Sequence, residues 1–430
     1  MPVAEELTVR YPETRRRIIA SHAGGIHLSR LPWRAALACL FVVLLFLAVA
    51  EAETCLSPFV KRLDRPEKIL YVFCLDANAK ANDFLAVIDV DKDSPKYSQI
   101  IYQLDLGSSG NETHHFGFTD DRTHIWGCSL FSSRIFIIDV ASDPAKPKLE
   151  KVLDDVPEKA EFSGPHSPYA LPGRMLISFL GSKDGGLPAG LAEFTNDGKF
   201  IRRFELPKDT PWGYDVAIKP DLNRMVTSSF THPANYKKPL KEMDFKKFGK
   251  DLLIWDYRER KVIQHLTAGA APLECRWSLK EGSNYGFTNC ALDNSIWLWE
   301  ADKDGKYATR KLCDTGKLPA DLRQSPDDRF LYVSCFVSNE IQQWDVSDLK
   351  NPKLVSTIKP GEQPNMMHVT GDGKRMYITN SLLSTMDRSD KFWVRLAHLT
   401  PEGMKLDESF KVDLTKFKTG PARGHDMLLY

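Results

Sequence analysis

The side chains of this sequence best suited to hold a metal ion are histidines in three stretches far apart along the chain. The adjacent pair His114 and His115 comes first, His166 follows, and His425 stands close to the last residue. Imidazole is a common ligand of transition metals, so four of them at one place predict a metal site. A single histidine is more often a hydrogen-bonded structural residue. The hypothesis therefore depends on whether the fold gathers these stretches.

Carboxylates occupy comparable positions in other parts of the chain, and a guanidinium follows one of them by two residues. The candidates for catalytic roles are Asp215, Glu274, Asp321 and Arg276. Such groups can orient an imidazole, act as a general base or balance charge, and they can equally well form polar rings that solvate a channel. The structural interpretation stays open beside the catalytic one.

A repeated two-strand pattern has to position all of these residues. In its clearest copy, a polar turn at 325–328 precedes a β-rich run up to Cys335, and a second run ends in Trp344-Asp345. This pattern predicts two antiparallel strands joined by a hairpin. The first run recurs at 70–74, 125–128, 175–178, 225–228, 286–290 and 376–379, and the second at 86–90, 135–140, 191–194, 253–256, 296–299 and 393–396.

Seven copies with a period of roughly 45 to 60 residues predict a seven-bladed β-propeller, because one blade cannot bury its apolar faces without neighbours. The run 321–324 would be an innermost strand and 353–358 an outermost one. The final residues 425–430 look like one more innermost strand. We expect them to pair with the run near Leu70 and so close the ring.

The innermost strands of a propeller line its central channel and all begin on one face. Counted back from the turn, His115, Asp215 and Asp321 fall at equivalent positions. A shift of one residue adds His166, Glu274, Asn365 and His425. The sequence therefore predicts that the histidines and carboxylates meet at one mouth of the channel. An insert at 231–250 lies on the same face, as a lid or as an ordinary surface loop.

Composition excludes some classes of function. The 58 lysines and arginines nearly balance the 57 aspartates and glutamates, so no overall field favours nucleic acid as a partner. One propeller over residues 67–430 accounts for most of the 430 residues, and a second domain is not required. Four of the eight cysteines recur at near-equivalent strand positions, which indicates packing before chemistry: Cys74, Cys128, Cys290 and Cys335.

The N-terminal residues form a separate region. A basic leader at 1–34 precedes an uncharged apolar run at 35–50, within a segment 35–52 that would be a signal-peptide core or a transmembrane anchor. Small residues around Ala50 favour cleavage, whereas the long leader favours an anchor. In either case the basic flank predicts an extracytoplasmic propeller, secreted or tethered to a membrane.

Several motifs resemble the selenium-binding protein family, whose members include methanethiol oxidases. The resembling stretches run in consistent order from about Leu70 to Met427. They include 83–91, 94–97, His114-His115, 132–135, 213–215, 272–274 and 327–332.

The resemblance implies a copper-dependent oxidase that converts methanethiol, oxygen and water into formaldehyde, hydrogen sulfide and hydrogen peroxide. Its metal-binding histidines carry over to His114, His115, His166 and His425. The chain departs from the family pattern in three places. Tyr169 and Ala170 follow His166 where the family has His-Cys, Ser98 replaces the proposed selenium-binding cysteine, and the Gly-Gly-Asp-Cys tail is missing.

Two other classes of function remain open at this stage. One is a non-catalytic exported propeller that binds a metal, a selenium or sulfur ligand, or a protein. The other is a zinc or calcium hydrolase of the propeller lactonase type, although such enzymes prefer carboxylate and asparagine ligands to histidines. Production of peroxide and sulfide from methanethiol would separate the oxidase from both.

Overall fold

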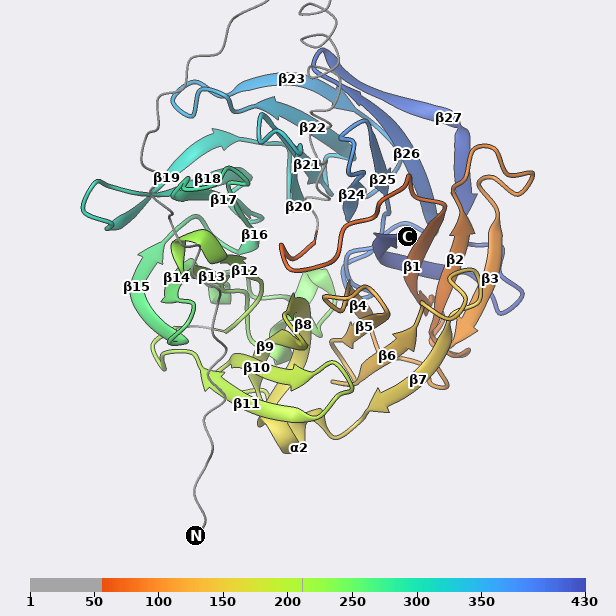
Figure 1. The fold of residues 1–430 in the computed structure, drawn as a ribbon, viewed down its shortest axis with the longest axis horizontal. Helices are drawn as coiled ribbons and strands as arrows, with labels where there is room; N and C mark the ends of the chain where they lie inside the picture. Colours follow the sequence, from red (N-terminus) through yellow and green to blue (C-terminus); the bar gives the residue numbers. More distant parts are fainter. Residues whose placement is uncertain (1–55, 211) are drawn as a thin grey trace, which may run out of the picture. The chain divides into compact units, whose positions relative to one another are not determined.

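The computed structural model describes residues 56–210 and 212–430, which form seven four-stranded antiparallel sheets arranged in a ring. The β-propeller expected from the repeats is confirmed, and every predicted strand run falls within an observed strand or extends it by one residue. Figure 1 shows the innermost strands of the blades around the centre and the outermost strands at the rim.

The first three blades contain the histidine stretches and the chain end. Their strands are β28 (Ala422–Leu429), β1 (Ile69–Asp76), β2 (Phe84–Asp89) and β3 (Ile100–Asp105); β4 (Thr113–Phe118), β5 (His124–Ser129), β6 (Ile135–Asp139) and β7 (Lys148–Leu153); and β8 (Phe162–Leu171), β9 (Arg174–Ser182), β10 (Gly190–Thr195) and β11 (Phe200–Glu205). The short helix α2 (Val156–Ala160) connects the second blade to the third.

The remaining four blades follow the same order from the centre outward. They consist of β12 (Val216–Lys219), β13 (Arg224–Ser228), β14 (Asp251–Asp256) and β15 (Lys261–Thr267); β16 (Pro272–Trp277), β17 (Tyr285–Cys290), β18 (Ser295–Ala301) and β19 (Tyr307–Asp314); β20 (Pro319–Gln324), β21 (Phe330–Cys335), β22 (Glu340–Asp345) and β23 (Lys353–Ile358); and β24 (Met367–Val369), β25 (Arg375–Ile378), β26 (Trp393–Thr400) and β27 (Gly403–Asp413). The fourth blade also carries η1 (Pro220–Leu222), α3 (Pro233–Tyr236), η2 (Leu240–Glu242) and η3 (Phe245–Lys247).

The ring closes as the sequence predicted. Strand β28 pairs antiparallel with β1, with Leu429 opposite Leu70 and Met427 opposite Val72. The first blade is thus built from both ends of the propeller sequence. Closure leaves no blade without a neighbour and removes the open edge that an incomplete ring would present.

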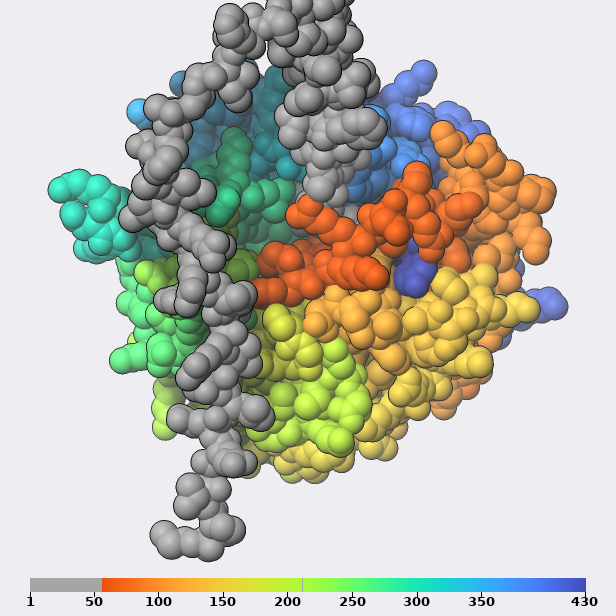
Figure 2. Space-filling model, in the orientation of Figure 1, coloured from red at the N-terminus to blue at the C-terminus, as the bar shows by residue number. Residues whose placement is uncertain are grey.

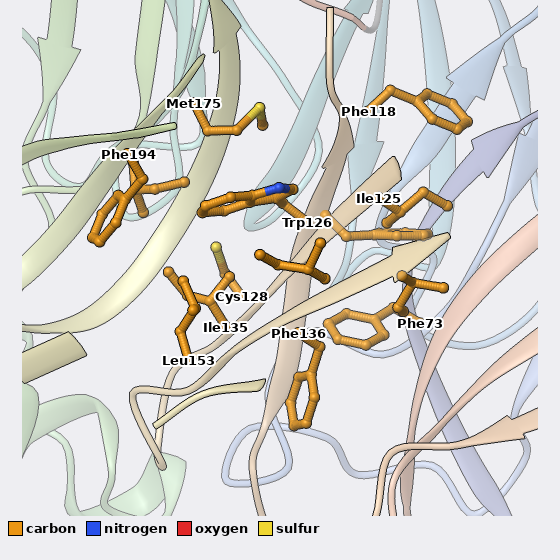
Figure 3. Packing of buried hydrophobic residues seen from close by; sticks show 14 of the residues in the cluster. Phe73, Phe118, Ile125, Trp126, Cys128, Ile135, Phe136, Leu153, Met175 and Phe194 are labelled. Carbon is orange, nitrogen blue, oxygen red and sulfur yellow. The ribbon is translucent and has the colours of Figure 1, made fainter. Parts of the chain in front are cut away.

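The core lies between the blades, where the two faces of neighbouring sheets pack together. Figure 3 shows one such layer, with Trp126 at its centre and Phe73 and Phe194 on either side. Each large apolar side chain buried there contributes about 1.5–3 kcal/mol. Gly127 permits this packing, since a Cβ at that position would come within 2.5 Å of the Phe73 ring.

Residues 56–62 cross the middle of the ring before the first strand begins. Their trace runs across the centre in Figure 1, and their atoms lie over the centre of the face seen in Figure 2. The hydroxyl of Ser57 donates to the carbonyl of Ala170 at 2.7 Å, and the amide of Lys61 donates to the carbonyl of Asp120 at 2.7 Å. These bonds attach the segment to the second and third blades.

The structure does not describe residues 1–55. The predicted leader, the predicted signal or anchor segment, Cys39 and Cys55 all fall in this range. Among the residues that the structure describes, no helix is long and apolar enough to span a membrane. The six cysteines described are free thiols, and the four at equivalent strand positions are fully buried. Their expected role in packing is therefore confirmed.

Candidate metal centre

The inner strands that carry the histidines are irregular where those residues occur. In β4, Thr113 pairs with Ser129 and Phe116 with Gly127, so the inner strand holds one residue more than its partner. The same one-residue excess occurs between Pro165 and Pro168 of β8, and between Gly424 and Met427 of β28. A regular strand alternates its side chains between faces, whereas such a bulge re-aims one of them.

The bulges bring four imidazoles into one buried cluster. The His115 ring lies 4.7 Å from that of His114 and 4.4 Å from that of His166, measured between centroids. His425 stacks on His114 at 3.7 Å. One ligand nitrogen from each of His114, His115 and His166 lies within 4.8 Å of the other two. His425 lies next to this trio, but it is not part of the group whose ligand nitrogens all lie within 4.8 Å of one another.

Several ring nitrogens of the cluster have no hydrogen-bond partner. They are Nδ1 of His114, Nε2 of His166 and Nε2 of His425, all fully buried. Unsatisfied buried polar atoms are costly and rare, and three of them at one point fit the ligands of a metal ion. The cluster could therefore bind a transition metal.

Burial keeps most of these imidazoles neutral, as a metal ligand must be. Burial, reinforced by the neighbouring imidazoles, lowers the pKa of His114 and of His166 well below the ordinary value. Burial and His115 lower the pKa of His425 to about 3. At neutral pH each of these three neutral imidazoles has one nitrogen with a lone pair that can bind a metal, and one N–H.

His115 differs from its neighbours because carboxylates flank it. Its Nδ1 lies 3.1 Å from a carboxylate oxygen of Asp426, and its Nε2 lies 3.6 Å from Oε1 of Glu274. Burial lowers the pKa of His115, but the hydrogen bond to Asp426 and the charge of Glu274 outweigh it, so the net shift is upward. Asp426 is thus a partner that can orient the His115 ring.

Among the predicted carboxylates, Glu274 alone has an oxygen without a hydrogen-bond partner, Oε1. Its other oxygen accepts from the Arg276 guanidinium at 2.5 Å. Burial, together with the charge of Asp215, raises the pKa of Glu274 to about 7, although Arg276 and His115 act in the opposite direction. Glu274 is therefore poised to hold or release a proton near neutral pH.

Asp215 and Asp321 have their oxygens occupied. Asp215 accepts from the Ser167 hydroxyl, the Cys275 amide and Arg276. Asp321 accepts from the amides of Leu322 and Met367 and from Arg323. Ser167 also contacts Nδ1 of His166 at 2.9 Å, so Asp215 reaches the histidine cluster through one hydroxyl.

Two cavities of opposite character meet the cluster. A channel cavity of about 360 Å³ contacts His115, Glu274 and Arg276 and extends along the inner strands to residues 56–62. An apolar pocket of about 30 Å³ contacts His114 and is lined by side chains such as Leu273, Phe248 and Leu383. His114 and His115 therefore face different surroundings although they are adjacent in sequence.

The insert at 231–250, expected to be either a lid over the channel or a surface loop, lines the apolar pocket and contributes no residue to the channel cavity. Leu240, Phe245 and Phe248 line the pocket from the insert. A loop of the seventh blade, residues 382–386, contacts the insert. The amide of Leu240 donates to the carbonyl of Thr385 at 3.1 Å, and the Thr385 hydroxyl donates to the carbonyl of Tyr236 at 2.9 Å.

All eight predicted site residues lie at this end of the channel, and Asn365 lies beside His425, with Nδ2 and Nδ1 3.2 Å apart. Three neighbours were missed by sequence reasoning: Asp426, Ser167 and Tyr214, whose ring packs 3.8 Å from that of His166. Each directly precedes or follows a predicted site residue. Alternation in a regular strand would point such a neighbour away, and only the bulges bring Asp426 and Ser167 inward.

Fold and site together define a seven-bladed propeller with a buried histidine centre at one end of its channel. The family model for the 56kDa selenium binding protein matches residues 53–430. The chain therefore belongs to the selenium-binding protein family, as the motifs indicated.

Relatives include a methanethiol oxidase from Hyphomicrobium, 37% identical over 87% of this chain and 89% of that protein. A methanethiol oxidase from Ruegeria pomeroyi is 32% identical over 89% and 93%. The human methanethiol oxidase is 29% identical over 84% and 92%.

Among solved structures, a hypothetical selenium-binding protein from Sulfolobus tokodaii matches with a TM-score of 0.78 and 28% identity, over 85% of this chain and 94% of that one. A periplasmic gluconolactonase from Pseudomonas aeruginosa has a TM-score of 0.60 at 12% identity, over 84% and 98% of the chains. The second likeness concerns the fold alone.

Proposed function

We propose that this chain is a copper-dependent oxidase of small thiols, of the methanethiol oxidase type. The reaction converts CH₃SH, O₂ and H₂O into HCHO, H₂S and H₂O₂, so that carbon loses two electrons and oxygen gains them. The observation that carries the proposal is the buried trio His114, His115 and His166, with ligand nitrogens within 4.8 Å of one another. The relatives named methanethiol oxidase give the reaction class.

Histidine nitrogens suit both oxidation states of copper, and a soft thiolate suits Cu(I). His114, His115 and His166 would hold the ion, and His425 would add a fourth nitrogen from the neighbouring blade. Bound copper would supply a Lewis acid for the thiolate sulfur and a path for electrons to oxygen. The channel cavity borders His115, and the apolar pocket borders His114.

Glu274 is the residue we assign to proton transfer. Its unpartnered Oε1 takes the S–H proton of the entering thiol, and Arg276 compensates the charge of the carboxylate. Asp426 orients His115, while Asp215 orients His166 through Ser167. The occupied oxygens of Asp321 fit a role in holding Arg323.

The test is a product and metal balance on the purified full-length protein. We expect copper to co-purify or bind stoichiometrically, and formaldehyde, sulfide and peroxide to form from methanethiol in equal amounts. His114→Ala and His166→Ala should each lose copper and activity, whereas the exposed control His398→Ala should keep both. Full product formation by copper-free protein would overturn the proposal. Copper binding without any thiol oxidation would favour a binding propeller.

We also propose that the propeller is exported, because a basic leader precedes the apolar run at 35–50. Cell fractionation, with N-terminal sequencing of the mature protein, would separate a cleaved signal from an anchor. Recovery of the uncleaved chain in the cytosolic fraction would contradict export.

A further inference from the structure

The apolar pocket beside His114 differs from the channel in chemistry as well as size. Among its lining residues only His114 and Tyr214 carry polar side-chain atoms. The others are leucines, phenylalanines, alanines and a methionine from five blades and their loops. Apart from these two side chains, the lining offers no hydrogen bonds to water, and it can hold a small alkyl group.

The volume of the pocket restricts what can occupy it. About 30 Å³ of free space leaves room for roughly two or three water-sized groups. Methanethiol has two heavy atoms, a carbon and a sulfur. Ethanethiol has three and reaches the limit of this space. Each methylene beyond that would need space that the packed walls do not provide, and overpacking such a wall is itself destabilising.

The orientation of a bound thiol follows from the position of His114 at one wall of the pocket. This imidazole carries a buried nitrogen without a hydrogen-bond partner and belongs to the metal-binding trio. A thiol whose sulfur points toward the cluster would place its alkyl group among the apolar side chains. The polar channel cavity reaches the cluster from the other side, beside His115 and Glu274.

We propose that this apolar pocket is the alkyl-binding site of the enzyme and limits its substrates to thiols with one or two carbons. This inference rests on the proposed function. Leu383, in the loop of the seventh blade, and Ala291, after β17, are two walls that can be altered without touching the histidines or Glu274. Both are buried and line the pocket.

The experiment compares methanethiol, ethanethiol and 1-propanethiol in two assays on the copper-loaded full-length protein. One assay measures kcat/KM, and the other measures binding under anaerobic conditions by calorimetry. For the unaltered protein, 1-propanethiol should be at least about tenfold worse than methanethiol in both. Leu383→Ala enlarges the pocket. It should therefore raise the ratio of the value for 1-propanethiol to the value for methanethiol at least about tenfold, both for kcat/KM and for binding affinity. Ala291→Leu should lower the binding affinity and kcat/KM for methanethiol by a similar factor, because the larger side chain fills the pocket.

Leu298→Ala, a buried leucine of β18 outside the pocket, is the matched control for lost stability and should leave the ratio unchanged. The inference is overturned if Leu383→Ala keeps the original ratio in the binding assay, or if Leu298→Ala shifts it equally. Chain-length dependence in binding without turnover of any thiol would refute the oxidase and retain the pocket assignment. Turnover that does not depend on the length of the thiol would retain the oxidase and refute the pocket assignment.

Discussion

The imidazole of His114 stacks on that of His425, with 3.7 Å between ring centroids and 22° between ring planes. The two residues are more than three hundred positions apart in the sequence and come from neighbouring inner strands, β4 and β28. Nδ1 of His425 lies 2.8 Å from the carbonyl of Ser381, which leaves Nε2 without a partner. The stack therefore fixes the ring while one nitrogen stays available.

His425→Phe separates the two roles of this residue. Phenylalanine retains an aromatic ring against His114 but has no nitrogen, so we expect copper affinity reduced at least about tenfold. The lost hydrogen bond to Ser381 should lower the free energy of unfolding by about 1 kcal/mol only. Copper titration and thermal unfolding of the same preparation measure the two effects. Unchanged copper affinity would mean that His425 only packs against the trio.

Asp426→Asn tests the orientation of His115. The change removes a carboxylate that hydrogen-bonds Nδ1 of His115 at 3.1 Å while preserving the side-chain shape. Loss of such a partner typically costs 10–100-fold in metal affinity or activity, and we expect a loss in that range. Asp407→Asn, which alters a carboxylate at the propeller rim, is the matched control. Equal copper affinities for the two variants would contradict the assignment.

Glu274→Gln tests proton transfer. The amide is nearly isosteric but cannot take a proton from the thiol, so kcat should fall roughly 10²- to 10⁴-fold while copper binding is retained. Glu300→Gln, on β18 and away from the channel, should behave as the unaltered protein. An activity within a few-fold of wild type would remove Glu274 from the mechanism.

A structural prediction concerns Glu193, a buried carboxylate of β10. It pairs with Arg260 at 2.8 Å, Arg202 at 3.0 Å and Arg174 at 3.2 Å. Burial opposes ionisation, yet these arginines outweigh it and hold the pKa of Glu193 below its ordinary value. The stabilisation is therefore present above the unfolded pKa and lost as pH falls through the folded one.

Glu193→Gln should accordingly lower the free energy of unfolding by about 1–3 kcal/mol at pH 7, since the buried Arg260 loses its counter-charge while Arg174 and Arg202 stay partly exposed to water. Below pH of about 4 the difference from the unaltered protein should shrink. Urea unfolding at pH 7 and pH 3.5 measures it, with the exposed Glu158→Gln as control. A loss of equal size at both pH values would show that charge is not the cause.

The fold was predictable because each blade repeats a local pattern, and seven weak signals reinforce one another. The chain-end strand was predictable because an innermost strand without a following partner has to pair elsewhere. Six of the eight site residues followed from their register relative to the turns, whereas His114 was added as the neighbour of His115 and Arg276 as a counter-charge. Asp426 and Ser167 did not, since their orientation depends on bulges, and a one-residue excess in pairing leaves no clear mark in the sequence. The apolar pocket depends on loops of different blades and requires coordinates.

Strand β28 closes the ring and also carries His425 and Asp426. Since this strand follows the other blades in the chain, a ribosome makes it after them, and a nascent propeller lacks one imidazole and the carboxylate that orients another. The pairing that closes the ring therefore also brings His425 and Asp426 to a histidine trio that the earlier blades already carry.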